Sequence, residues 1–127
     1  MNKKELISNL INFFKRFESI LDKKGEEEII RDATIQRFKF AIELLWKTMK
    51  RLLQYEKENV ETPREVIKKA YKLKWINDEK IWLSMLDDRN STSHTYNEKL
   101  SEEIYRRIKT YYKELKSTID ILENKYT

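Results

Sequence analysis

Three side chains suited to proton transfer and anion binding lie within eight residues of one another. Arg89, His94 and Tyr96 share the segment 87–96, and His94 is the only histidine of the chain. An imidazole gives or takes a proton near neutral pH, and a guanidinium is a permanent cation whose forked donors suit phosphate oxygens. The alternative is a capped turn that carries a surface histidine, and both interpretations stay open on the segment alone.

The backbone between these side chains must bend if they are to meet. On an ideal helix, Arg89 and His94 would lie about 140° apart around the axis and would not share a face. The residues between them form the one uncharged polar run of a charge-dense chain: Asn90, Ser91, Thr92 and Ser93. Such side chains bond to nearby backbone groups and favour turns over helix interiors. We therefore expect a helix break here, with these four residues supporting the site.

The composition excludes most sites that need a metal or a bound cofactor. The chain has no cysteine, which excludes disulfides, zinc–thiolate sites and iron–sulfur clusters. One histidine excludes a multi-histidine metal site, and one glycine excludes a phosphate-binding loop or a dinucleotide fingerprint. Asp87 and Asp88 are adjacent, so on a helix their carboxylates point to different sides. We predict no metal and no cofactor.

The charge balance allows an acidic partner without requiring one. Lysine and arginine number 27 against 22 acidic residues, so the net charge is +5. This excess is compatible with RNA, a nucleotide or an acidic protein. The longest uncharged N-terminal stretch, residues 7–14, is too short for a membrane span and is followed by no cleavage site. We expect a cytoplasmic protein without a membrane partner.

The elements that must position the segment are all predicted to be helices. A single glycine and a single proline are too few for the turns of a β-rich fold. Apolar residues recur at spacings of three and four, which predicts helices over residues 2–23, 27–58, 63–74, 78–89 and from 97 or 101 to 124. Gly25 is the expected stop of the first helix, and a break near Asp32 stays open. Thr62 is expected to cap the third helix with Glu65 closing a capping box, and Asp78 is expected to cap the fourth helix. The prediction is one all-α domain over 1–127, an up-and-down bundle of four to five helices.

The polar segment also resembles a known motif. Arg89, four residues, His94, Thr95 and Tyr96 match the R-x4-H-x-Y signature of HEPN domains, a nucleotide-binding family of higher eukaryotes and prokaryotes. Further segments resemble the branch known as nucleotidyltransferase substrate-binding proteins: 31–38, 43–47, 62–67 and 88–98. The resemblance covers residues 27–122.

This resemblance implies a dimeric helical bundle that works with a cognate minimal nucleotidyltransferase. Members of the broader family are metal-independent ribonucleases, and several are toxins. In related toxin–antitoxin pairs, the transferase is the antitoxin and silences the nuclease by adding AMP to the tyrosine of the motif. Carried onto this chain, the resemblance makes Arg89 and His94 catalytic and Tyr96 the modified residue, with RNA as the substrate.

The residue types fit such a reaction. Metal-free RNA cleavage needs a base for the 2′-hydroxyl, an acid for the leaving 5′-oxygen and a cation beside the phosphate. One histidine cannot be both acid and base in a single turnover without another group. A twofold homodimer that brings together two His94–Arg89 pairs would supply both.

Two other functions stay open. The chain could be a non-catalytic subunit that presents a substrate or nucleotide to a partner transferase. It could also be a helical dimerisation module whose polar segment is only a turn.

Overall fold

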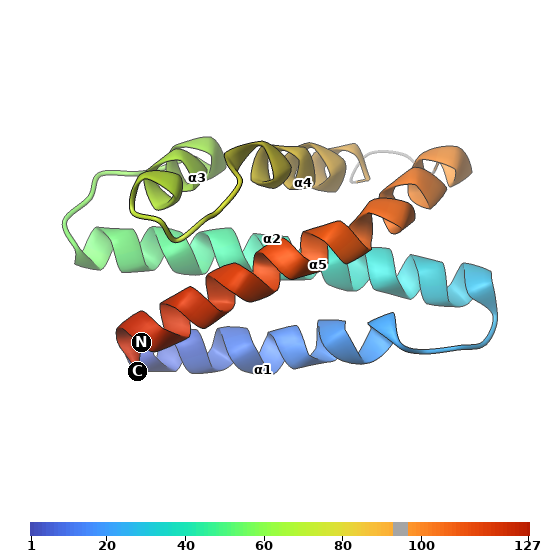
Figure 1. Cartoon of the computed structure of the whole chain (residues 1–127), viewed down its shortest axis with the longest axis horizontal. Helices are drawn as coiled ribbons and strands as arrows, with labels where there is room; N and C mark the ends of the chain where they lie inside the picture. Colours follow the sequence, from blue (N-terminus) through green and yellow to red (C-terminus); the bar gives the residue numbers. More distant parts are fainter. Residues whose placement is uncertain (93–96) are drawn as a thin grey trace.

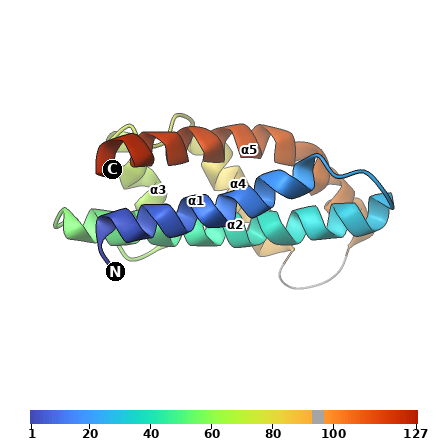
Figure 2. The same cartoon turned by 90° about the horizontal axis from the view of Figure 1, so that it is seen from below.

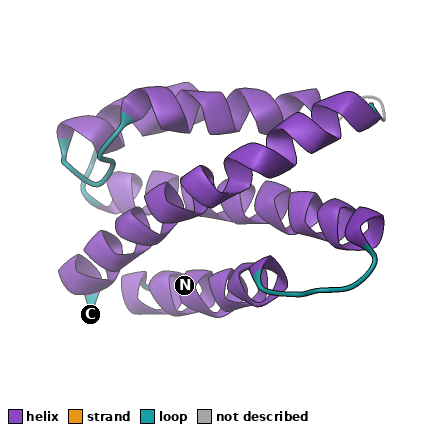
Figure 3. Ribbon diagram, turned by 45° about the vertical axis from the view of Figure 1, so that its right-hand side comes forward, coloured by secondary structure: helices purple, strands orange, loops and turns teal. Residues whose placement is uncertain are grey.

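The computed structural model describes residues 1–92 and 97–127, and this part of the chain is helical with no strand (Figures 1 and 3). The prediction of an all-α fold is therefore confirmed. The five helices are α1 (Lys3–Leu21), α2 (Glu27–Tyr55), α3 (Pro63–Lys72), α4 (Glu79–Ser91) and α5 (Glu98–Tyr126).

The bundle is built around α2, which contacts all four other helices. Helices α1, α2 and α5 are long, and α5 crosses α2 obliquely (Figure 1). The short helices α3 and α4 follow one another along α2, so together they take the place of a fourth long helix. The end of α4 thereby comes to lie between α2 and α5.

The core explains why these segments are helices. On α2 the buried residues recur every three or four positions, which places them on one broad apolar face: Ile35, Phe38, Ile42, Leu45, Met49, Leu52 and Leu53. Helix α5 contributes a similar face, and α4 contributes Trp82, which is completely buried. Buried apolar area of this kind supplies most of the stability of helices that would be marginal alone.

Side-chain caps define where four of the helices begin. The side chains of Asn2, Thr62, Asp78 and Asn97 each accept a hydrogen bond from the backbone N–H three residues later. The predicted Thr62 cap is confirmed. Glu65, expected to complete a capping box with Thr62, instead accepts from the Glu61 N–H at 3.0 Å.

Several sequence-based helix boundaries differ from the structure; α2, for example, ends at Tyr55 and not at residue 58. Helix α1 ends at Leu21, so Gly25 is not its stop; Gly25 lies in the connection to α2 with φ +153°, a conformation that favours glycine. Helix α2 runs through Asp32 without a break. Helix α4 continues past Arg89 to Ser91, because the Thr92 hydroxyl and N–H bond to the last turn and cap it there.

Candidate functional site

Arg89 projects from the last turn of α4 toward α2. Its guanidinium contacts the carboxylate of Glu43 at 2.7 Å, and its Nη1 donates to the side chain of the next residue, Asn90, at 3.0 Å. About 33% of the Arg89 side chain is accessible to solvent. The cation is therefore held in one orientation while part of it stays within reach of an anion.

Glu43 is kept ionised by its neighbours on α2. It also contacts the Lys47 ammonium at 3.0 Å and accepts from the Trp46 indole at 3.2 Å. Burial alone would raise the pKa of Glu43, but the bonds from Lys47 and Trp46 and the charges of Arg89 and Lys47 lower this pKa below its ordinary value. A charged carboxylate thus faces Arg89 at neutral pH.

The preceding residue, Asp88, ties the end of α4 to α5. Its buried carboxylate accepts two hydrogen bonds from Arg107, at 2.8 and 2.9 Å, and a third from the Tyr111 hydroxyl. Tyr111 also shares a 2.9 Å hydrogen bond with Ser84, one turn earlier on α4. The hydrogen bond to Asp88 raises the pKa of Arg107, because it stabilises the charged guanidinium.

Asp87 points to a third helix and pairs with Arg64 of α3 at 3.3 Å. The adjacent carboxylates of Asp87 and Asp88 thus lie on different sides of α4, as expected. Among the described residues, no group of three acidic or histidine side chains could hold a metal ion. The same part of the chain contains no helix long and apolar enough to cross a membrane.

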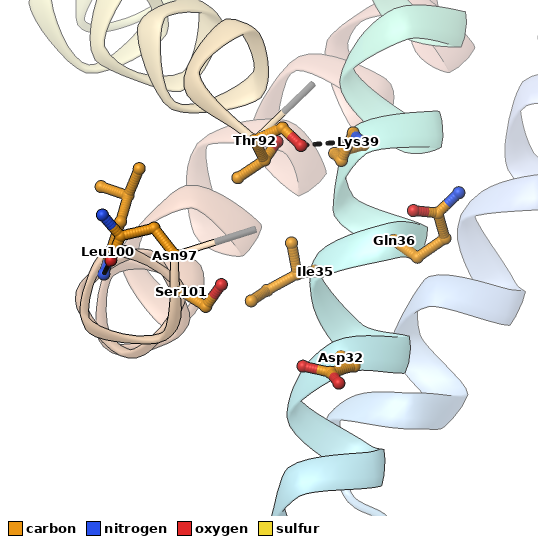
Figure 4. Close-up of a pocket in the computed structure, with 8 residues that line it drawn as sticks. All are labelled: Asp32, Ile35, Gln36, Lys39, Thr92, Asn97, Leu100 and Ser101. Carbon is orange, nitrogen blue, oxygen red and sulfur yellow. Dashed lines mark hydrogen bonds between the residues drawn. The ribbon is translucent and has the colours of Figure 1, made fainter. Parts of the chain in front are cut away.

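A pocket opens beside the end of α4 (Figure 4). The Lys39 ammonium of α2 donates to the Thr92 carbonyl across it at 3.5 Å. The pocket lies between α2, the end of α4 and the start of α5, and is lined by Asp32, Ile35, Gln36, Lys39, Thr92, Asn97, Leu100 and Ser101. Most of these side chains are polar, which suits a polar ligand more than an apolar one.

The described residues include only part of the predicted site. Arg89, Asn90 and Ser91 belong to the last turn of α4, and Thr92 is its C-terminal cap. The other predicted site residues, Ser93, His94 and Tyr96, lie outside the described residues.

Sequence reasoning missed the contacts that hold the end of α4: Asp88 with Arg107 and Tyr111, Arg89 with Glu43, and Thr92 with Lys39. Segment 43–47 contributed to the family resemblance, but nothing in its composition assigned Glu43 a contact. Asp88 belongs to segment 88–98 of the resemblance and is adjacent to Asp87, but neither fact assigned it a partner on another helix. The sequence does place a carboxylate, that of Asp88, immediately before the motif arginine. A buried carboxylate needs a cation or hydrogen-bond donors around it, and this requirement was the signal available in the sequence.

Comparison with known proteins agrees with this architecture. A solved protein of Thermus thermophilus superposes with a TM-score of 0.75 at 28% identity, covering 95% of this chain and 98% of the other. A Haemophilus influenzae structure, described as a substrate binding domain of a nucleotidyltransferase, gives a TM-score of 0.76 at 24% identity over 96% and 99% of the two chains. These two structural similarities define the fold class, a helical bundle with the same arrangement of helices as this chain.

The family follows from the sequence match. The model of the family described as "Nucleotidyltransferase substrate binding protein like" matches residues 5–124, so the chain belongs to that family. A curated Haemophilus influenzae relative, "Probable ribonuclease HepT", is 34% identical over 79 residues, which are 58% of this chain. The match spans about half of that relative, 54% of its length. The resemblance drawn from the motif is confirmed at the level of the family.

The buried Asp88 contact yields a prediction about stability. Asp88→Asn keeps the shape of the side chain but removes the charge that faces Arg107, so we expect the free energy of unfolding to fall by about 2 kcal/mol. Asp87→Asn is the matched control, because the Asp87–Arg64 pair is exposed and should contribute less than about 1 kcal/mol. Urea unfolding followed by circular dichroism at pH 7 measures both. Equal losses of unfolding free energy in the two variants would show that the Asp88 contact stabilises the fold no more than an exposed ion pair does.

The depressed pKa of Glu43 predicts a pH dependence. A carboxyl whose folded pKa is lowered adds stability above its unfolded pKa and loses it as pH falls through the folded value. The melting temperature of the parent should therefore exceed that of Glu43→Gln near neutral pH, and the gap should close as pH falls below the ordinary value of 4.5. The exposed Glu123→Gln should show little difference at any pH. A difference in melting temperature that grows as the pH falls would contradict the lowered pKa of Glu43.

Proposed function

We propose that this chain is a metal-independent endoribonuclease, the toxin of a pair with a minimal nucleotidyltransferase. The observation that carries the proposal is the partly accessible Arg89, held by Glu43 at the end of α4, at the first position of the R-x4-H-x-Y motif. The match to a relative named a probable ribonuclease supports the same activity.

The proposed reaction uses general acid–base catalysis. One His94 imidazole takes the proton of the ribose 2′-hydroxyl, and the freed oxygen forms a bond to the neighbouring phosphorus. The bond from phosphorus to the 5′-oxygen breaks, and a second His94, from the other copy in a homodimer, gives that oxygen its proton. Arg89 neutralises the phosphate oxygens as charge gathers on them.

Tyr96 is the proposed control point. The partner transferase would join the phenol oxygen to the α-phosphorus of ATP, with release of pyrophosphate and of the phenol proton. The product adds a negative charge and an adenosine two residues from His94 in the sequence. That charge would compete with RNA phosphate for the Arg89 guanidinium.

A second candidate is a non-catalytic subunit that presents a substrate or nucleotide to the partner transferase. The family description, which concerns substrate binding, favours it. In that case the substrate or nucleotide would bind in the polar pocket between Lys39 and Thr92. The two candidates differ in one measurable respect, because only the nuclease cleaves RNA when it is alone.

The catalytic assignment predicts the behaviour of two variants. Arg89→Ala and His94→Ala should each lower the rate of RNA cleavage in EDTA by about a hundredfold or more, because each removes a positioned catalytic group. The melting temperature of His94→Ala should stay close to that of the parent, and Arg89→Ala should lose only its partly exposed ion pair with Glu43, which contributes about 1 kcal/mol or less. Arg64→Ala, an exposed arginine on α3, is the control and should cleave like the parent. RNA that stays intact with the parent protein would favour the binding subunit.

The control assignment predicts where AMP is attached. After incubation with the partner transferase and ATP, intact-mass spectrometry should show AMP-sized additions on the parent and none on Tyr96→Phe. Tyr96→Phe should keep most of its cleavage activity and resist silencing, because its ring is unchanged. Tyr105→Phe, an exposed tyrosine on α5, should be modified like the parent. AMP-sized additions on Tyr96→Phe would exclude Tyr96 as the modified residue.

A further inference from the structure

The excess positive charge of the chain is concentrated on one short helix. Segment 63–74 consists of α3 and the two residues after it. Its charged residues are five basic and one acidic: Arg64, Lys68, Lys69, Lys72, Lys74 and Glu65. The net charge of this segment is +4, whereas the whole chain carries +5, so the other 115 residues are almost neutral together. A local excess of this kind attracts an anionic partner more than the same charge spread over the whole surface would.

Helix α3 lies on the outside of the molecule. Among the described helices it contacts only α2 and α4. It lies on the side of α2 away from α1, at the top in Figure 1 and in the distant, fainter layer of Figure 2. Its buried residues are Val66, Ile67 and Ala70. Lys68, Tyr71 and Lys72 occupy the exposed face of the helix, where a ligand can reach them.

Three exposed lysines of this segment form no ion pair within the described part of the chain: Lys68, Lys72 and Lys74. The acidic side chains around α3 bond to other groups: Asp87 to Arg64 at 3.3 Å, Glu58 to Lys69 at 3.1 Å, and Glu65 to the Glu61 N–H at 3.0 Å. The charges of the three lysines are therefore available to a ligand.

An exposed aromatic ring lies among these lysines. Tyr71 is 45% exposed, follows Lys68 by three residues and is adjacent to Lys72. Residues three apart on a helix are neighbours on its surface. Proteins that bind single-stranded nucleic acid combine such groups, because the cations contact the phosphates and the ring stacks on a base. The basic α3 surface is the name used below for four residues: Lys68, Tyr71, Lys72 and Lys74.

We propose that the basic α3 surface is a second RNA contact, which binds a single-stranded part of the substrate outside the Arg89 site. This inference rests on the proposed function, in which RNA is the substrate. The start of α3 is joined to α4 by the Arg64–Asp87 pair, two residues before Arg89. Lys68 follows Arg64 by about one helical turn. A strand held at Arg89 can therefore continue over α3.

The distribution of apolar residues favours RNA over a protein on this surface. Leu73 is the other exposed apolar residue of the segment, and it is two positions from Tyr71. Residues two apart on a helix point to different sides, so Leu73 and Tyr71 form no common apolar patch. A protein interface has an apolar core within a polar rim, whereas here a single ring is surrounded by lysines. Binding of an acidic protein is therefore an outcome that the experiment has to detect separately.

The first test measures RNA binding without cleavage. All variants carry His94→Ala, and fluorescence anisotropy with fluorescein-labelled poly(U) of about 20 nucleotides gives the Kd at several salt concentrations. The double variant Lys68→Gln and Lys72→Gln should raise the Kd about tenfold at about 0.1 M salt. The slope of log Kd against log salt should fall by about 1.4, because each phosphate contact with a single strand contributes about 0.7.

The matched control removes two lysines from another helix. Lys109 and Lys113 on α5 are exposed and have the same spacing of four residues. They border a pocket together with the acidic residues Glu18 and Asp22 of the α1 side. Lys109→Gln and Lys113→Gln change the net charge by the same amount, and we expect them to change the Kd by less than about twofold. The comparison separates the position of the charge from its total.

The second test examines stacking. Tyr71→Ala should raise the Kd for poly(U) about fivefold or more, because it removes a ring on which a base can stack. Tyr71→Phe keeps the ring and should bind like the parent. Tyr105→Ala, at a similarly exposed tyrosine on α5, should also bind like the parent.

The third test uses a position where loss of charge does not weaken the fold. Lys74 follows the cap of α3 with φ +64°, a left-handed conformation that favours glycine. Lys74→Gly should keep or raise the melting temperature and yet raise the Kd for poly(U) about twofold or more. Lys57 follows the cap of α2 with φ +63°, between Glu56 and Glu58. Lys57→Gly makes the same change in backbone and charge, and it should leave the Kd unchanged.

The outcomes separate this inference from the proposed function. Variants of the basic α3 surface that bind poly(U) like the parent, or a parent that does not bind poly(U), would overturn the inference. Loss of binding in these variants, together with a parent that cleaves no RNA, would support the RNA contact while overturning the proposed ribonuclease. Loss of the complex with the partner transferase in size-exclusion chromatography, at an unchanged Kd for poly(U), would make α3 a protein surface and overturn the RNA contact.

Discussion

The buried carboxylate of Asp88 is the contact on which the geometry of the α4 end depends. Helix α4 has only 13 residues, too few to be stable by itself. Three hydrogen bonds from Arg107 and Tyr111 satisfy the Asp88 carboxylate and join this end to α5. Successive residues on a helix turn by about 100°. With Asp88 directed at α5, Asp87 faces α3 and Arg89 faces α2, so one buried charge orients three side chains.

Helix α2 serves the core and the site at once. Its inner face carries Phe38 and Ile42, which are buried, and its flank carries Lys39 and Glu43, one turn apart. Lys39 holds the carbonyl of Thr92 while Glu43 holds the guanidinium of Arg89. The rigid, continuous helix therefore fixes the distance between the two contacts. A break at Asp32 would have separated the start of α2 from the part that holds α4.

Both candidate functions need a cation that a phosphate can reach from the solvent. A nuclease uses it to stabilise charge on a phosphate during reaction, and a binding subunit uses it to hold a phosphate at rest. The structure makes Arg89 suitable for either, because Glu43 orients it without covering it. Glu43 also contacts Lys47 and Trp46, so its carboxylate has donors other than Arg89. What separates the two functions is proton transfer, which the arginine does not perform.

The local features of this fold could be predicted from the sequence, and its long-range contacts could not. One glycine, one proline and regular apolar spacing indicated an all-helical bundle, and Thr62 and Asp78 marked helix starts because a cap bonds only three residues away. The motif located Arg89 by its spacing. Tertiary structure alone decided that Arg89 pairs with Glu43 and that Asp88 pairs with Arg107. Helical periodicity distinguishes a buried face from a solvated one, but it assigns no partner to a charge on the solvated face. Those partners were chosen only when the apolar faces packed and brought distant helices side by side.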